Sequence, residues 1–69
     1  MRVKELVNAM DNCLFQVEKY NKDIDEYEIV CDIYTEIPKV IGEKKVIVAT
    51  PSIGKDLNGI EHTVICVEI

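Results

Sequence analysis

Hydrophobic and polar residues alternate with a period of two over residues 62–69. β-branched side chains dominate this stretch, as is typical of a pleated, half-buried surface, so the pattern predicts a strand. A chain end that carries apolar side chains frays unless sheet neighbours hold it. We therefore expect this strand inside the sheet or at a subunit interface. One face would carry Thr63, Ile65, Val67 and Ile69, and the other His62, Val64, Cys66 and Glu68.

The N-terminal residues 2–11 show a helical period instead. Apolar residues recur at i, i+3, i+4 and i+7, which predicts a short amphipathic helix. A helix of fewer than three turns is marginal by itself in water, so we expect its apolar stripe to pack on the sheet. Asp11 and Asn12 are a plausible end, because both compete with the helix for backbone hydrogen bonds. The stripe consists of Val3, Leu6, Val7 and Met10.

Two further alternating segments, residues 13–20 and 27–34, predict a pair of strands joined by a polar turn at 21–26. So short a connection implies an antiparallel hairpin. One face would cover the helix stripe with Phe15, Val17, Ile29, Cys31 and Ile33. The opposite face mixes Tyr20, Val30 and Tyr34 with charged residues.

The second half of the chain contains a turn, a strand and a loop. Pro38 and Gly42 suit the first helical position and the position just past the end of one helical turn, although a tight loop fits equally. Residues 45–50 predict a third strand, which is apolar on both faces and hence central. Pro51 would end it or mark an edge bulge. The pair Asn58-Gly59 predicts a type I′ turn before the last strand.

These elements predict a single small α+β domain over residues 1–69, with an antiparallel sheet of about four strands and the N-terminal helix packed on one face. The composition, 48% hydrophobic and 30% charged, is that of a globular protein. A chain of 69 residues buries only a small core. Because small domains often gain stability from a partner subunit, we expect a homo-oligomer.

Charge and cysteine content narrow the classes of function. The net charge of −5 argues against a nucleic-acid partner, which requires a basic stripe. There is no apolar run of about 18 residues, so we expect no membrane span. Three cysteines without a secretory signal predict reduced thiols in a cytoplasm. The cysteines are widely separated and there is one histidine, so we expect no metal site and no cofactor.

Residues 50–55 are the first candidate for ligand binding. Thr50, Ser52, Gly54 and Lys55 form a hydroxyl-rich loop after a strand, and such a loop can hold an anion through hydroxyls, backbone amides and one charge. It departs from a P-loop, because the first glycine is absent and Asp56 follows the lysine. The alternative is a structural loop or bulge.

His62 is the second candidate, and the predicted hairpin register places it opposite Lys55. It could contact the same anionic ligand or lie at a surface or interface. As a catalytic base it lacks a partner, because Cys66 would be about 13 Å away along the strand. We therefore predict no catalytic residues.

A protein interface is the other candidate site. Tyrosine buries a large area and keeps a polar tip, which suits an interface, although ordinary cross-strand packing explains it too. The acidic residues concentrated over 18–28 form either a solvated hairpin tip or a surface for a basic partner. The predicted interface residues are Tyr20, Tyr27, Tyr34, Ile65, Val67 and Ile69.

One resemblance adds to this reading. The opening Val3-Lys4-Glu5-Leu6-Val7 with Asp11-Asn12-Cys13, then a hairpin, then Glu36-Ile37-Pro38 leading into Lys45-Val46, resembles small uncharacterised proteins of phages and mobile elements of Gram-positive bacteria. The likeness ends at Thr50. It implies a protein of the host-cell cytoplasm, in families that include counter-defence proteins acting by binding.

We therefore expect a non-enzymatic binding protein, a phage or mobile-element accessory factor that acts as a homo-oligomer and sequesters or blocks a host component. One alternative is an oligomer that binds a small anionic, nucleotide-derived signal in pockets at subunit interfaces. A lesser alternative is a small hydrolase, which would need His62 to find a carboxylate across an interface.

Overall fold

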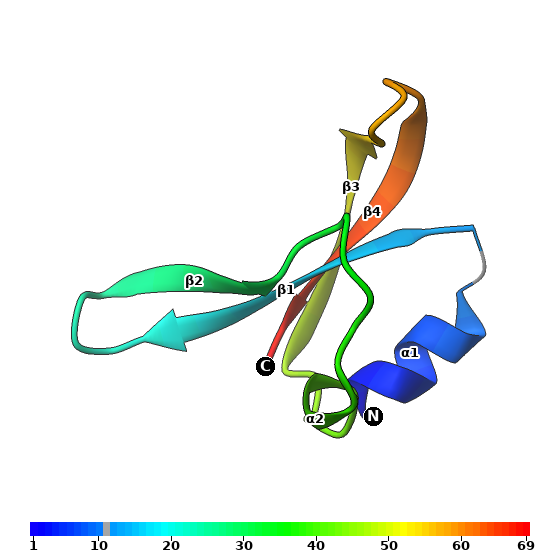
Figure 1. The fold of residues 1–69 in the computed structure, drawn as a ribbon. Coiled ribbons are helices and arrows are strands. Elements are labelled where there is room, and N and C mark those ends of the chain that lie inside the picture. The colour runs from blue at the N-terminus through cyan, green and yellow to red at the C-terminus, as the bar shows by residue number, and fades with distance from the viewer. Residues whose placement is uncertain (11) are drawn as a thin grey trace.

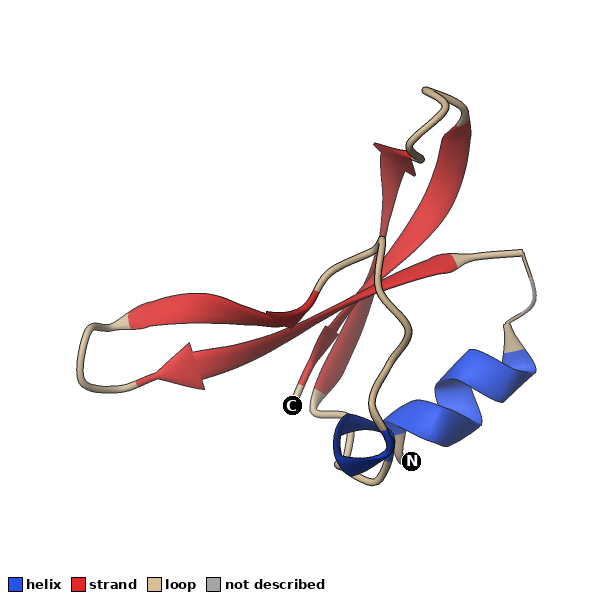
Figure 2. Ribbon diagram, viewed as in Figure 1, coloured by secondary structure: helices blue, strands red, loops and turns tan. Residues whose placement is uncertain are grey.

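Residues 1–10 and 12–69, the part of the chain that the computed structural model describes, form a four-stranded sheet with two short helices on one side of it (Figures 1 and 2). The strands lie in the order β2-β1-β4-β3. The predicted α+β class, with an N-terminal helix against one face, is confirmed. The elements are α1 (Val3–Ala9), β1 (Leu14–Asn21), β2 (Glu26–Cys31), α2 (Lys39–Gly42), β3 (Val48–Lys55) and β4 (Glu61–Glu68).

The sheet is mixed rather than wholly antiparallel. β1 runs parallel to β4, with Phe15 beside Ile65 and Val17 beside Val67, while β1–β2 and β3–β4 are antiparallel hairpins. A parallel pair needs a long crossover connection, and here β2, α2 and β3 supply it. The expectation of an antiparallel sheet was wrong for this central pair. Side-chain alternation shows which residues share a face, but not the relative direction of strands that are distant in sequence.

Helix α1 packs through the predicted stripe. Val3 is fully buried, and Leu6, Val7 and Met10 pack against the core. At the N-terminus the backbone N–H of Arg2 donates to Glu5 Oε1 at 2.9 Å, which satisfies one of the free amides of the first turn. Asp11, one of the two residues predicted to end this helix, lies outside the described residues.

The core lies between the two central strands and the helices. Val17 and Val67 are fully inaccessible, and Phe15, Cys31 and Ile65 complete the buried cluster around them. β4 has a neighbour on each side, which confirms the prediction that the last strand lies inside the sheet. A single helical turn, α2, follows Pro38, which is its N-cap rather than its first helical residue, and Gly42 is its last residue rather than the position just past its end. Ile41 from this turn also packs against the core.

A bulge divides the first hairpin. Val17 pairs with Cys31 and Glu18 with Ile29, so β2 has one extra residue, Val30, at this point. The bulge keeps Cys31 on the covered face and places Ile29 beside Glu18 on the other face, where 58% of Ile29 is exposed. The prediction that Ile29 covers the helix stripe was therefore wrong. The predicted strand 27–34 also ends early, at Cys31.

The third strand occupies different residues from those predicted. β3 runs from Val48 to Lys55 and pairs only with β4, so it is an edge strand rather than a central one. Pro51 lies within it, opposite Ile65. Proline lacks an N–H and is tolerated in a strand mainly at an edge. The expected loop at 50–55 is thus a strand.

The β3–β4 turn is also of a different type from the predicted type I′. Gly59 has φ +79°, and its N–H donates to the Asp56 carbonyl at 3.0 Å. Asp56 N–H donates in turn to the Ile60 carbonyl at 3.0 Å, which closes a three-residue loop over 57–59. A three-residue hairpin loop of this kind combines a type I turn with one left-handed residue, and glycine takes that position at no steric cost.

Candidate functional site

The predicted anion-binding residues do not converge in one pocket. Thr50 pairs with Cys66 and Ser52 with Val64, so these two hydroxyls follow one another along the extended edge strand. Successive residues on one face of a strand lie about 6.6 Å apart, and Lys55 points to the opposite face from Ser52. A backbone cradle for an anion requires a turn, and residues 50–55 form none.

Gly54 has a structural role instead. A Cβ atom at this position would lie 2.8 Å from Val64 Cγ2 and 3.8 Å from Ile33 Cδ1. The glycine therefore allows close packing between β3, the buried Val64 and the chain that follows β2.

His62 is paired with an aspartate, not with Lys55. The register places His62 opposite Gly54, and Lys55 opposite Glu61. His62 Nε2 lies 2.6 Å from Asp56 Oδ2, while Asp56 Oδ1 accepts the N–H groups of Asn58 and Ile60 at 2.9 and 3.0 Å. The contact with His62, followed by the backbone bond from Ile60, lowers the pKa of Asp56. This network stabilises the β3–β4 turn, so the histidine has a structural partner.

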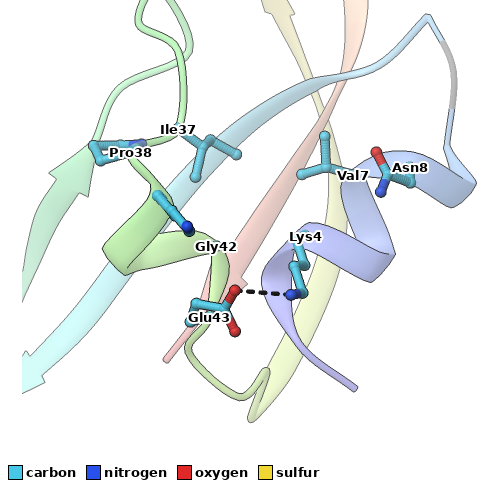
Figure 3. Close-up of a pocket in the computed structure, with 8 residues that line it drawn as sticks. Lys4, Val7, Asn8, Ile37, Pro38, Gly42 and Glu43 are labelled. Atoms are coloured by element: carbon cyan, nitrogen blue, oxygen red, sulfur yellow. Dashed lines mark hydrogen bonds and ion pairs between the residues drawn. The ribbon is translucent and has the colours of Figure 1, made fainter.

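A small hollow lies between the two helices (Figure 3). Its volume is about 170 Å³, below the range of about 300–1,000 Å³ that is usual for ligand pockets. Two of its charged groups are already paired with each other, because Lys4 Nζ lies 2.8 Å from Glu43 Oε1, and Arg2 lies 3.0 Å from the other oxygen of Glu43. The hydrogen bond from Lys4 is the main cause of the lowered pKa of Glu43. This hollow is a contact between helices.

The predicted tyrosine interface is divided by the fold. Tyr20 and Tyr27 pair across β1 and β2 with ring centroids 5.3 Å apart, and both are exposed. Tyr34 lies beyond the end of β2, where its hydroxyl donates to the Lys55 carbonyl at 3.1 Å. Two of the three tyrosines therefore share one surface.

Two of the three aliphatic residues predicted for an interface are core residues. Ile65 is 4% exposed and Val67 is fully buried, because both lie on the face that the helices cover. Their assignment to an interface was wrong. Ile69 is half-buried and packs against the core beside them.

The sheet face turned away from the helices has a more distinctive arrangement, which we call the open face. Glu18 and Glu68 are direct neighbours across the parallel strands β1 and β4, with Ile29 and Val48 on their outer sides. Gln16 Nε2 donates to Glu18 Oε1 at 2.9 Å. Tyr27 completes the group, since the charge of Glu68 is the main cause of the raised pKa of this tyrosine.

Like charges directly opposite one another on a sheet are destabilising. The ion pairs found among residues 1–10 and 12–69 involve Glu43 and Asp56, so neither Glu18 nor Glu68 has a described cationic partner. Around the two carboxylates lie exposed apolar surfaces of Tyr27 (56%), Ile29 (58%) and Val48 (49%). The open face is therefore acidic at its centre and apolar at its margins.

Sequence reasoning missed a second surface, which we call the lysine groove. It has a volume of about 480 Å³ and lies where the β1–β2 hairpin meets the α2–β3 connection. Three of the chain's eight basic residues gather there, one from the hairpin and an adjacent pair from the α2–β3 connection. Lys44-Lys45 followed by apolar residues was the available signal. Its lining consists of Lys19, Val30, Ile41, Lys44, Lys45, Ile47 and Ile69.

In the described part of the chain, the cysteines and the acidic residues form no metal centre. Cys13, Cys31 and Cys66 are free thiols. Within the described residues, no group of three or more His, Cys, Asp and Glu side chains is arranged to hold a metal ion. In the same residues, no helix has the length and apolar character needed to span a membrane.

Comparison of the chain with protein-family models, with curated proteins and with solved structures gave no match. The function is therefore inferred from the open face and the lysine groove.

Proposed function

We propose that this chain is a non-catalytic binding protein whose open face docks on a basic surface of a partner protein. One observation carries the proposal: Glu18 and Glu68 lie side by side, and neither has a cationic partner among the described residues. A lysine or arginine placed between them would remove a repulsion that the free chain has to tolerate. The net charge of −5 would also attract a basic partner at long range.

The apolar margin supplies the remaining chemistry of an interface. Aromatic side chains are enriched at protein-binding surfaces, and tyrosine is enriched among the residues that dominate binding energy. Tyr27 combines both properties, because its ring is exposed and its hydroxyl lies beside Glu68. Its ring also packs against Tyr20 and is thereby held in place before binding.

A stoichiometric action fits this surface better than catalysis. His62 is engaged by Asp56, and the exposed Tyr20 and Tyr27 with the half-buried glutamates of the open face form a broad face rather than an enclosed pocket. The resemblance to phage and mobile-element proteins makes a host protein the first class of partner to test, and blocking or sequestration the first mode of action.

Quantitative capture from a bacterial extract tests the proposal. The native chain is compared with Glu18→Lys/Glu68→Lys and with the matched control Glu36→Lys/Glu61→Lys, which changes the net charge equally at exposed positions away from the open face. We expect a partner that native and control chains retain and that the open-face variant loses. With that partner purified, calorimetry should give saturable binding, weakened about thirtyfold by Tyr27→Ala. Equal retention of every captured protein by both variants would contradict the proposal.

A further inference from the structure

The lysine groove has two kinds of lining that are complementary to one segment of this same chain. Part of its lining is aliphatic and includes Val30, Ile41 and Ile47, which we call the floor. The lining also contains three exposed lysines, Lys19, Lys44 and Lys45, which we call the rim and whose charges form no ion pair with residues 1–10 or 12–69. A cleft with an apolar floor and a cationic rim selects an occupant with an apolar centre flanked by anions.

The tip of the β1–β2 hairpin has this composition. Ile24 is 52% exposed at the turn and is flanked by Asp23 and Asp25, with Glu26 next in sequence. The turn is well defined, because Asp23 N–H donates to Asn21 Oδ1 at 2.9 Å and the Tyr20 hydroxyl donates to Asp25. An isoleucine between carboxylates is thus presented on a structured tip.

The hairpin projects away from the helices and from the β3–β4 hairpin, so its tip stands clear of the rest of the molecule (Figure 1). The groove lies at the base of the same hairpin, since Lys19 and Val30 belong to it. A tip cannot fold back on its own base in a straight β-hairpin. Two copies arranged antiparallel about a two-fold axis would each place the tip beside the base of the other.

We infer that the lysine groove receives the acidic hairpin tip of a second copy of this chain, giving a two-fold dimer with two identical tip-in-groove contacts. Ile24 would occupy the aliphatic floor, and Asp23 and Glu26 would lie against the lysine rim. This contact uses the helix side of the hairpin, where Lys19 projects, and leaves Glu18 and the open face free. The inference therefore does not depend on the proposed function.

Charge exchange between groove and tip tests this contact. The groove variant is Lys44→Glu/Lys45→Glu and the tip variant is Asp23→Lys/Glu26→Lys; Asp25 is kept because of its bond to Tyr20 and its φ of +53°. Sedimentation equilibrium of each variant alone should show a dimer dissociation constant raised about tenfold or more, because like charges then face each other. The matched control for the groove, Lys39→Glu/Lys55→Glu, should leave it within about twofold.

Mixing the two variants gives the decisive result. The acidic groove then meets a basic tip and the basic groove meets an acidic tip, so the mixture should form heterodimers at least tenfold more tightly than either variant self-associates. Dimerisation of the native chain should also weaken as salt rises from about 0.05 to 0.5 M. A native chain that stays monomeric up to about 0.5 mM, a groove variant that matches its control, or a mixture that does not associate would each overturn the inference. So would binding of a small amphipathic anion such as decanoate in the groove of a monomer.

Discussion

Replacing Gly54 by alanine tests the close packing of β3 on β4 most directly. Alanine normally stabilises a strand relative to glycine by about 0.5–1 kcal/mol. Here its Cβ would lie 2.8 Å from Val64 Cγ2, about 0.7 Å inside the roughly 3.5 Å lower limit of a favourable carbon contact. Val64 is 4% exposed and stiff about χ1, so it cannot rotate away cheaply. Overpacking of this kind costs about 1–3 kcal/mol, so we expect a net loss of about 1–2 kcal/mol.

A double-mutant cycle isolates the cause. Val64→Ala removes the obstructing methyl, so Gly54→Ala in that background should become neutral or stabilising, with a coupling energy of about 1–3 kcal/mol. Urea unfolding followed by circular dichroism measures each variant, with unchanged m-values confirming that the same surface unfolds. Gly59→Ala is the control: its φ of +79° makes alanine unfavourable, but nothing lies within 4 Å, so it should not couple to Val64. Stabilisation by Gly54→Ala alone, or additivity within about 0.5 kcal/mol, would refute the packing argument.

Three further outcomes follow from the core and from the displaced pKa values. Val67→Ala should lower the free energy of unfolding by about 2–3 kcal/mol, because the Val67 side chain is fully buried. Ile53 is 75% exposed, so Ile53→Ala should change that free energy by less than about 0.5 kcal/mol in the same urea experiment. Because the pKa of Glu43 is lowered, the contribution of this carboxylate to stability is present above the ordinary value of 4.5 and disappears as the pH falls through the folded-state pKa. Glu43→Gln should therefore reduce the fall of the thermal midpoint over that acid range. A variant whose midpoint falls with acid as in the native chain would contradict the ion pair. The pKa of Tyr27 is raised above 10.0, mainly by the charge of Glu68. Glu68→Gln should therefore bring the pKa of this phenol back toward 10.0 in a titration followed by ultraviolet absorbance. An unchanged pKa of Tyr27 would contradict the placement of Glu68 beside it on the open face.

The sequence by itself determined the elements whose local pattern and packing agree. Val3, Leu6, Val7 and Met10 can share a face only in a helix, and that face is the one buried. The alternation of apolar and polar residues in β1 and β4 likewise showed which side chains share a face of each strand. Pro38 indicated the single helical turn of α2. The spacing of apolar residues and the position of a proline involve only residues that are close together in the sequence, so they can be recognised without the tertiary structure.

The tertiary structure alone decided the relations between distant residues. The parallel pairing of β1 with β4 places Glu18 beside Glu68, 50 positions apart in sequence, and so creates the open face. The position of β3 at the sheet edge made a strand of the expected ligand loop, because edge pairing accommodates Pro51 and close packing on Val64 requires Gly54. The lysine groove likewise exists only where the first hairpin meets the α2–β3 connection. Strand order and direction depend on the total free energy of the sheet together with the helices and loops that pack on it. No single segment of the chain determines that total.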